Sequence, residues 1–123
     1  MRIREGVNGE PISARLRQLA VSDQRWAEHY ARLVELVALL EALPPDELFG
    51  AEIIERRPPA LLIVGTRGRA VTVRPDHYDG RAAVESPLHF RIRIDRGPGT
   101  IADETRIVEP AAAAARVRQE LFA

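Results

Sequence analysis

Histidine and arginine side chains gather in the second half of the sequence. His77 lies in a polar segment, and His89, Arg91 and Arg93 alternate with apolar residues along the hydrophobic stretch that follows. Histidine can act as a general acid or base near neutral pH, and arginine binds phosphate through planar, paired hydrogen bonds. His77, His89 and Arg91 therefore supply the residue types for a metal-independent ribonuclease or another small hydrolase.

The same residues also suggest a binding surface. If the strands that carry them pair in one sheet, its solvent-exposed face presents Arg74, His89, Arg91 and Arg93. Such a cluster can hold phosphate or carboxylate, or its arginines can pair with nearby acids such as Glu85 and Asp95. Aromatic residues make up only 5% of the chain and the formal net charge is zero, so we do not expect nucleic-acid binding to be the main role.

Metal and cofactor chemistry has little support in the sequence. The segment 76–80, with Glu85 and His89 beyond it, contains oxygen and imidazole ligands, but its spacing fits neither a calcium loop nor a zinc-binding helix. We interpret this segment as a polar turn. The chain has no cysteine, and all 18 of its basic residues are arginine, which excludes thiol nucleophiles and lysine Schiff bases. We expect no metal and no cofactor.

Length and composition indicate a single globular domain. The chain has 123 residues, of which 46% are hydrophobic and 29% charged. We predict a flexible leader over 1–10 and one domain over 11–123. The first residues do not resemble a signal peptide, and the apolar stretch 33–43 is too short to cross a membrane, so we expect a cytoplasmic protein. The absence of lysine fits a GC-rich bacterial genome, or selection against lysine itself.

The most apolar element is a long helix predicted over 23–43, after a short helix over 11–20. Apolar residues recur along it at spacings of three and four, and others fill the remaining sides of its second half. A helix that is apolar on most sides needs more than one partner. We therefore expect a homodimer that forms through this helix, with an interface made by Trp26, Tyr30, Leu33, Leu36, Val37 and Leu40.

The rest of the chain predicts an antiparallel sheet and a closing helix. Residues 46–57 are ambiguous, because 45–47 resemble a helix start whereas Ile53 and Ile54 can begin a strand; we predict a short helix followed by an undetermined stretch. The other predicted elements are strands over 60–64, 69–74, 88–95 and 105–108, a loop over 75–87 and a helix over 111–122. The expected fold is α+β, with N-terminal helices, a sheet of three to four strands with one open face, and a C-terminal helix.

A glycine-containing turn follows the first predicted strand. Residues 62–69, Leu-Ile-Val-Gly-Thr-Arg-Gly-Arg, resemble the strand and glycine loop with which universal stress proteins meet nucleotide phosphates. The resemblance covers these eight residues alone. That family continues into a helix, whereas Ala70 to Val73 alternate as a strand does, so we interpret the segment as a hairpin turn and assign no family.

These observations favour a non-enzymatic bacterial interaction module, such as an accessory, chaperone-like, immunity or regulatory subunit. It self-associates through the 23–43 helix and presents either the open face of its sheet or the 75–87 loop to a protein partner. The excess of apolar helix surface and the absence of a catalytic motif support this hypothesis. The alternatives are the hydrolase that uses His77 and His89, and nucleic-acid binding through Arg74, Arg91 and Arg93.

Overall fold

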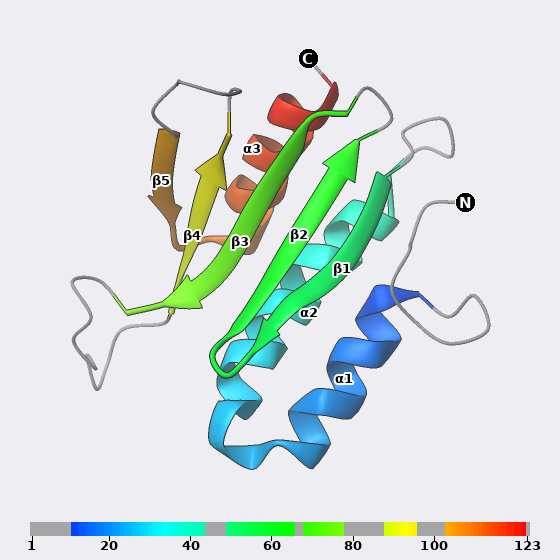
Figure 1. The fold of residues 1–123 in the computed structure, drawn as a ribbon, viewed down its shortest axis with the longest axis vertical. Coiled ribbons are helices and arrows are strands. Elements are labelled where there is room, and N and C mark those ends of the chain that lie inside the picture. The colour runs from blue at the N-terminus through cyan, green and yellow to red at the C-terminus, as the bar shows by residue number, and fades with distance from the viewer. Residues whose placement is uncertain (1–10, 44–48, 66–67, 78–87, 96–102, 123) are drawn as a thin grey trace.

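The computed structural model describes residues 11–43, 49–65, 68–77, 88–95 and 103–122 (Figure 1). It confirms an α+β fold with helices at both ends of the chain and an antiparallel sheet between them. The predicted leader lies outside the described residues. The elements are α1 (Ile12–Ser22), a 3₁₀ turn (Gln24–Trp26), α2 (Ala27–Glu41), β1 (Phe49–Arg56), β2 (Pro59–Gly65), β3 (Ala70–Asp76), β4 (His89–Ile94), β5 (Asp103–Ile107) and α3 (Pro110–Phe122).

The sheet is an antiparallel meander in which every strand pairs with the next one along the chain, in the order β1-β2-β3-β4-β5. The ladder between β3 and β4 places Val73 opposite Ile92 and Arg74 opposite Arg91. Because side chains alternate between the two faces of a strand, this register gives one face of the sheet to apolar residues and the other mainly to polar ones.

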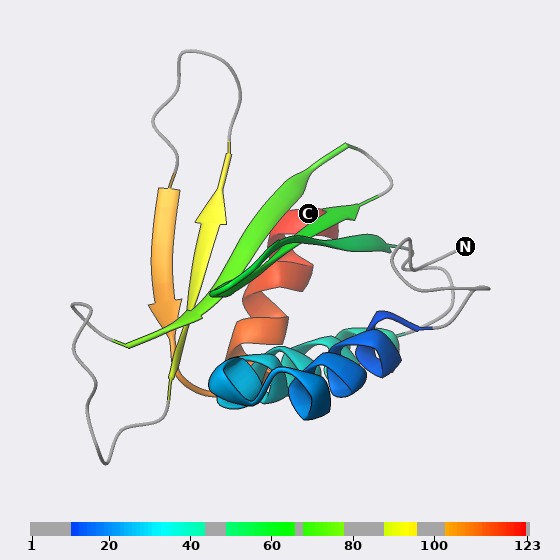
Figure 2. The same ribbon diagram turned by 60° about the horizontal axis from the view of Figure 1, so that its bottom comes forward.

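All three helices lie on the same side of the sheet, as Figure 2 shows. Helices α2 and α3 contact the strands, whereas α1 packs mainly against α2. The core lies between these two layers, and its largest buried side chains are Tyr30, Phe49, Phe90, Ile12, Leu16, Leu33, Leu36, Leu40, Leu61, Ile63, Leu88 and Ile92. We call the side of the sheet that faces the helices the covered face, and the other side the open face.

One predicted element differs in its described part. We expected a short helix at the start of 46–57; residues 46–48 lie outside the described residues, and 49–56 form strand β1 instead of continuing a helix. Strand β1 pairs with β2 from Phe49 opposite Gly65 to Arg56 opposite Pro59. Two adjacent β-branched residues, Ile53 and Ile54, favour the strand, and hairpin pairing with the apolar β2 outweighs the helix-start signal. The sheet consequently has five strands where we expected three to four.

The remaining predicted elements are confirmed with small shifts of boundary. The long helix is interrupted near its start, because residues 24–26 form the 3₁₀ turn before α2 begins. Strand β3 extends through Pro75 to Asp76, two residues that we had placed in a loop. The proline is tolerated because it stands next to the last residue of the strand. The pairing of β2 with β3 confirms the predicted hairpin.

Two side-chain contacts fix the helices relative to one another and to the sheet. At the start of α1, the Ser13 hydroxyl donates to Glu41 Oε1 at 2.5 Å, and the Ser13 backbone N–H donates to Oε2 at 3.3 Å. The Glu41 carboxylate thus caps α1, where the helix dipole favours negative charge. The Tyr30 hydroxyl donates to the Arg56 carbonyl oxygen at 2.9 Å, which ties α2 to the end of β1.

Arg32 connects α2 to two parts of the sheet. Its Nη2 donates to the Leu88 carbonyl oxygen at 3.0 Å and also to the Val108 carbonyl oxygen, so it joins the start of β4 to the end of β5. The guanidinium also lies over the Phe90 ring, with Cζ 4.6 Å from the ring centroid. The side chain is only 13% exposed. A charged group at this depth is stable because carbonyl oxygens, an aromatic ring and the Glu35 carboxylate surround it.

Helix α3 lies very close to β2 at Gly65. A β-carbon built at this position would be 2.9 Å from the Leu121 carbonyl oxygen and 3.3 Å from the Leu121 β-carbon. The first of these contacts is with backbone, which cannot rotate away. The absence of a side chain at Gly65 therefore permits α3 to approach the sheet this closely.

No helix among the described residues is long and apolar enough to cross a membrane.

We predict that Gly65→Ala will lower the free energy of unfolding by about 1 to 3 kcal/mol, because the added methyl group pushes α3 away from β2. Urea denaturation measures the change. Gly68 serves as the control position, because it has φ +78° and no atom within 4 Å of a built β-carbon. Gly68→Asn should cost about 0.5 kcal/mol or less, because asparagine tolerates a positive φ. Equal losses in the two variants would contradict the close approach of α3.

We predict that Arg32→Met will lower the free energy of unfolding by about 2 to 3 kcal/mol, because two carbonyl oxygens lose a charged donor while the apolar part of the side chain is kept. Thermal and urea denaturation measure the loss. Arg17→Met, on an exposed position of α1, is the matched control and should change stability by about 0.5 kcal/mol or less. If the two variants were equally stable, Arg32 would not hold the layers together.

Candidate functional site

The open face of the sheet is the candidate site, because the three helices all lie on the covered face (Figure 2). The registers of β2 to β5 determine which side chains point outward from it. One cross-strand row runs from Thr72 through Arg93 to Glu104, and the next runs from Arg74 through Arg91 to Arg106. The predicted binding residues Arg74, His89, Arg91 and Arg93 all belong to this face, so the structure brings them together as expected.

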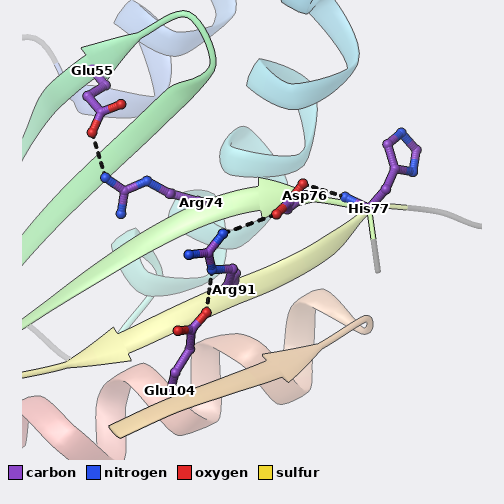
Figure 3. A network of polar contacts seen from close by, with 6 residues as sticks. All are labelled: Glu55, Arg74, Asp76, His77, Arg91 and Glu104. Atoms are coloured by element: carbon purple, nitrogen blue, oxygen red, sulfur yellow. Dashed lines mark hydrogen bonds and ion pairs between the residues drawn. The ribbon is translucent and has the colours of Figure 1, made fainter. Parts of the chain in front are cut away.

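Carboxylates accompany the arginines of the open face. Arg91 contacts two of them, Asp76 Oδ2 at 3.2 Å from Nη1 and Glu104 through Nε, and so bridges β3 and β5 (Figure 3). Arg74 Nη2 lies 2.5 Å from Glu55 Oε1 of β1. These pairs cross the sheet from strand to strand. The interpretation that the arginines pair with nearby acids is thus correct for this part of the chain.

Arg93 follows the same pattern, with its Nε 3.6 Å from Asp95 Oδ1. Both side chains are more than half exposed, so this ion pair contributes little to stability. The other acid that the sequence suggests as an arginine partner, Glu85, lies outside the described residues. Most of the predicted 75–87 loop does too. Arg74, Arg91 and Arg93 each have an acidic neighbour, and the described part of the open face therefore carries interleaved charges of both signs.

Arg91 is the central member of this network. The hydrogen bond that Arg91 donates to the Glu104 carboxylate raises the pKa of the guanidinium further, and the Asp76 carboxylate adds to the effect, while desolvation acts in the opposite direction. Asp76 also accepts a hydrogen bond from the His77 backbone N–H at 2.8 Å, which fixes the carboxylate at the end of β3. Arg91 is thus oriented from two sides.

The part of the open face over β2 is less polar, although Glu52 and Glu55 of β1 border it. Leu62 and Val64 point outward from β2 and are half-buried. A shallow depression lies beside them, lined by Gly50, Ala51, Glu52, Leu62 and Val64. Next to it, Ile54 is 42% exposed at the β-bulge of β1. The open face therefore combines an apolar strip with an arginine-rich, charge-paired region.

The structure separates the two histidines proposed for catalysis. His89 alternates with the buried Leu88 and Phe90, so its side chain belongs to the open face. His77 follows Asp76 and turns to the other side, where its ring centroid is 6.4 Å from that of His29 on α2. Figure 3 shows the His77 ring directed away from Arg91. The sheet thus lies between the two imidazoles, and they do not converge on one reacting group.

His77 instead belongs to a cluster of rings at the start of α2. Trp26 and His29 meet edge to face with centroids 4.9 Å apart, and His77 approaches His29 at an interplanar angle of 85°. Burial lowers the pKa of His29; Glu28 opposes this effect, His77 adds to it, and Asp76 opposes it. The Nδ1 atoms of both histidines are buried and have no hydrogen-bond partner among the described residues. For His29, whose pKa is lowered, this burial favours the neutral imidazole.

The residues predicted for a dimer interface are, with one exception, inside the fold. Trp26 is half-buried, and the other five are at most 1% exposed within a single chain: Tyr30, Leu33, Leu36, Val37 and Leu40. A second copy cannot reach these five side chains while the fold is intact. Helix α2 is apolar on several sides because α1, α3 and the sheet all contact it. Homodimer formation remains a prediction, but these residues do not provide its surface.

Within the described residues, no three histidine or acidic side chains come together as a possible metal site. Comparisons with family models, curated proteins and solved structures find no match to this chain.

The sequence predicts acidic partners for these arginines but does not identify most of them. Asp76 belongs to the predicted polar turn and Glu104 has no predicted role, although both contact Arg91. Glu55 lay in a segment whose structure was undetermined. The available signal was the alternation of Asp103 to Ile107, which places Glu104 on one face and Thr105 on the other once the segment is taken as a strand.

We predict that the stability of the protein will fall as the pH decreases below about 6.5, the ordinary pKa of histidine. The folded-state pKa of His29 is lowered, so the unfolded chain takes up this proton first, and the loss ends below the folded-state pKa. His29→Phe should remove this part of the pH dependence, as measured by urea denaturation between pH 5 and 8. An unchanged profile in the variant would contradict the assignment.

His77→Phe provides an independent check on the same cluster. It removes the neighbouring imidazole that helps to lower the pKa of His29. An NMR titration should therefore show the pKa of His29 moving back toward its ordinary value in this variant. A shift in the opposite direction would mean that changed burial, rather than the charge of His77, controls the pKa of His29.

Proposed function

We infer that the protein is a non-enzymatic interaction module that binds a protein partner through the open face. An accessory, chaperone-like, immunity or regulatory subunit fits this description. The observation that carries the inference is the composition of the open face, in which two half-buried apolar residues of β2, Leu62 and Val64, adjoin arginines that are already paired with carboxylates.

A protein partner suits this combination better than a simple anion does. Protein interfaces commonly join an apolar centre to a polar rim that is rich in arginine. On the open face, the apolar centre would consist of Leu62 and Val64, and the polar rim would consist of Arg74, Arg91 and Arg93. An anion would have to compete with Asp76 and Glu104 for Arg91, at a cost in existing hydrogen bonds. Alternating charges can instead be matched by the alternating charges of a protein surface.

The two alternatives have less support. A ribonuclease that uses both His77 and His89 requires their side chains on one side of the sheet, and they lie on opposite sides. Nucleic-acid binding requires a surface of predominantly positive potential. The acids between Arg74, Arg91 and Arg93 reduce that potential on the described part of the open face.

Site-specific photocrosslinking in cells of the natural host tests the proposal. A benzophenone amino acid replaces Thr72, at the centre of the open face, and in a second strain it replaces Val21, which is 75% exposed on α1. We expect the Thr72 position to give one discrete adduct with another protein, and the Val21 position to give none. Adding Arg91→Glu should reduce the yield about tenfold, because it breaks the network that presents the face.

Equal adducts from both positions, or no protein adduct from Thr72, would contradict the proposal. If Thr72 instead crosslinks to nucleic acid, and high salt during irradiation prevents this crosslink from forming, the nucleic-acid alternative would be favoured.

A further inference from the structure

The two outer strands of the sheet have different edges. Strand β1 carries a β-bulge between Ile53 and Glu55, which interrupts its regular hydrogen-bonding pattern. Strand β5 pairs with β4 through five consecutive residues without a shift of register. Among the described residues, each of these strands has a strand neighbour on one side only. A bulged edge resists further strand pairing, whereas a regular edge can accept another strand.

The side chains of β5 alternate between the two faces. Glu104 and Arg106 lie on the open face, opposite Arg93 and Arg91 of β4, and Thr105 lies on the covered face, opposite Ile92. Residues that stand directly opposite each other in an antiparallel pair share a face. If a second copy adds its own β5 in antiparallel orientation, one residue must therefore stand directly opposite the same residue of the second copy, with the two-fold axis midway between them.

Among the registers centred on Glu104, Thr105 or Arg106, which keep at least three residues of each β5 paired, only one matches the charges. A pair centred on Glu104 places this carboxylate opposite its own copy, and a pair centred on Arg106 does the same with two guanidinium groups. Like charges directly opposite each other are destabilising. A pair centred on Thr105 places each Glu104 opposite Arg106 of the second copy, twice by symmetry, and joins two threonines on the covered face.

The charge arrangement within one chain supports the same register. On the open face, Arg106 stands directly opposite Arg91, a residue of like charge. Arg106 also takes part in an interaction within its own chain. Pairing through β5 adds the carboxylate of the second copy on the other side of Arg106. The resulting open-face row runs Arg91, Arg106, then Glu104 and Arg93 of the second copy.

We propose that two copies of this protein dimerise by antiparallel pairing of their β5 strands, centred on Thr105, so that the two sheets become one continuous sheet. This surface is separate from α2, whose apolar residues are inside the fold, and it leaves the centre of the open face accessible. The shared strand edge is only five residues long, so the dimer buries little area and should be weak.

Sedimentation velocity between about 10 and 500 µM, a range suited to weak association, tests the proposal. We expect a concentration-dependent dimer for the natural sequence. Arg106→Glu should raise the dissociation constant about tenfold or more, because both symmetric pairs become pairs of like charge. In a single chain this change places a carboxylate opposite Arg91, so the folded monomer should be retained, and circular dichroism checks it.

The charge-swapped protein, with Glu104→Arg and Arg106→Glu together, is the decisive variant. It restores opposite charges across the two-fold axis, so its dissociation constant should return to within about threefold of the original value. Arg56→Glu on β1 makes the same charge change at the bulged edge and should leave dimerisation unaltered. A monomer at every concentration, a dimer insensitive to Arg106→Glu, or a dimer weakened by Arg56→Glu would each overturn the proposal.

Discussion

The position of all three helices on one side of the sheet is the constraint on which the rest of the structure depends. The strands form a meander with no crossover between them, and helices precede and follow it. One face therefore buries the apolar residues of β2, β3 and β4 against α2 and α3. Among the described residues no helix covers the other face, so its residues must be compatible with water or with a partner. The arginines and acids of β3 to β5 meet that requirement by pairing with one another.

The same constraint explains the composition of α2. This helix lies between α1, α3 and the sheet, so apolar residues are needed on several of its sides within one chain. Arg32 shows how the helix is fixed in that position, because its guanidinium reaches the carbonyl oxygens that border β4 and β5. An apolar surface on several sides of a helix thus follows from three partners in the same small domain, and it does not by itself require a second molecule.

Both proposed binding surfaces are ones that the helices leave uncovered among the described residues. The open face offers apolar and charge-paired regions side by side, and the β5 edge offers backbone hydrogen-bonding groups with a self-complementary charge pattern. These two surfaces meet at Glu104, which contacts Arg91 on the open face and stands on the edge strand.

The sequence alone determined the elements whose patterns have a single interpretation. Strict alternation fixed β4, and the spacing of apolar residues together with proline positions fixed α1 and α3. It also placed Arg74, His89, Arg91 and Arg93 on one face, because alternation along a strand depends only on local geometry. Strand β1 could not be assigned in this way, since the helix and strand signals of its segment were similar in strength and pairing with β2 decided between them.

Only the tertiary structure decided which groups meet. Asp76, Glu104 and Glu55 are far from Arg91 and Arg74 in sequence, and register brings them together. The separation of His77 from His89 depends on the direction in which the chain leaves β3, and the burial of Leu36 and Val37 depends on two other helices. Local sequence specifies the period of an element, but the partners of a side chain are set by the packing of distant segments.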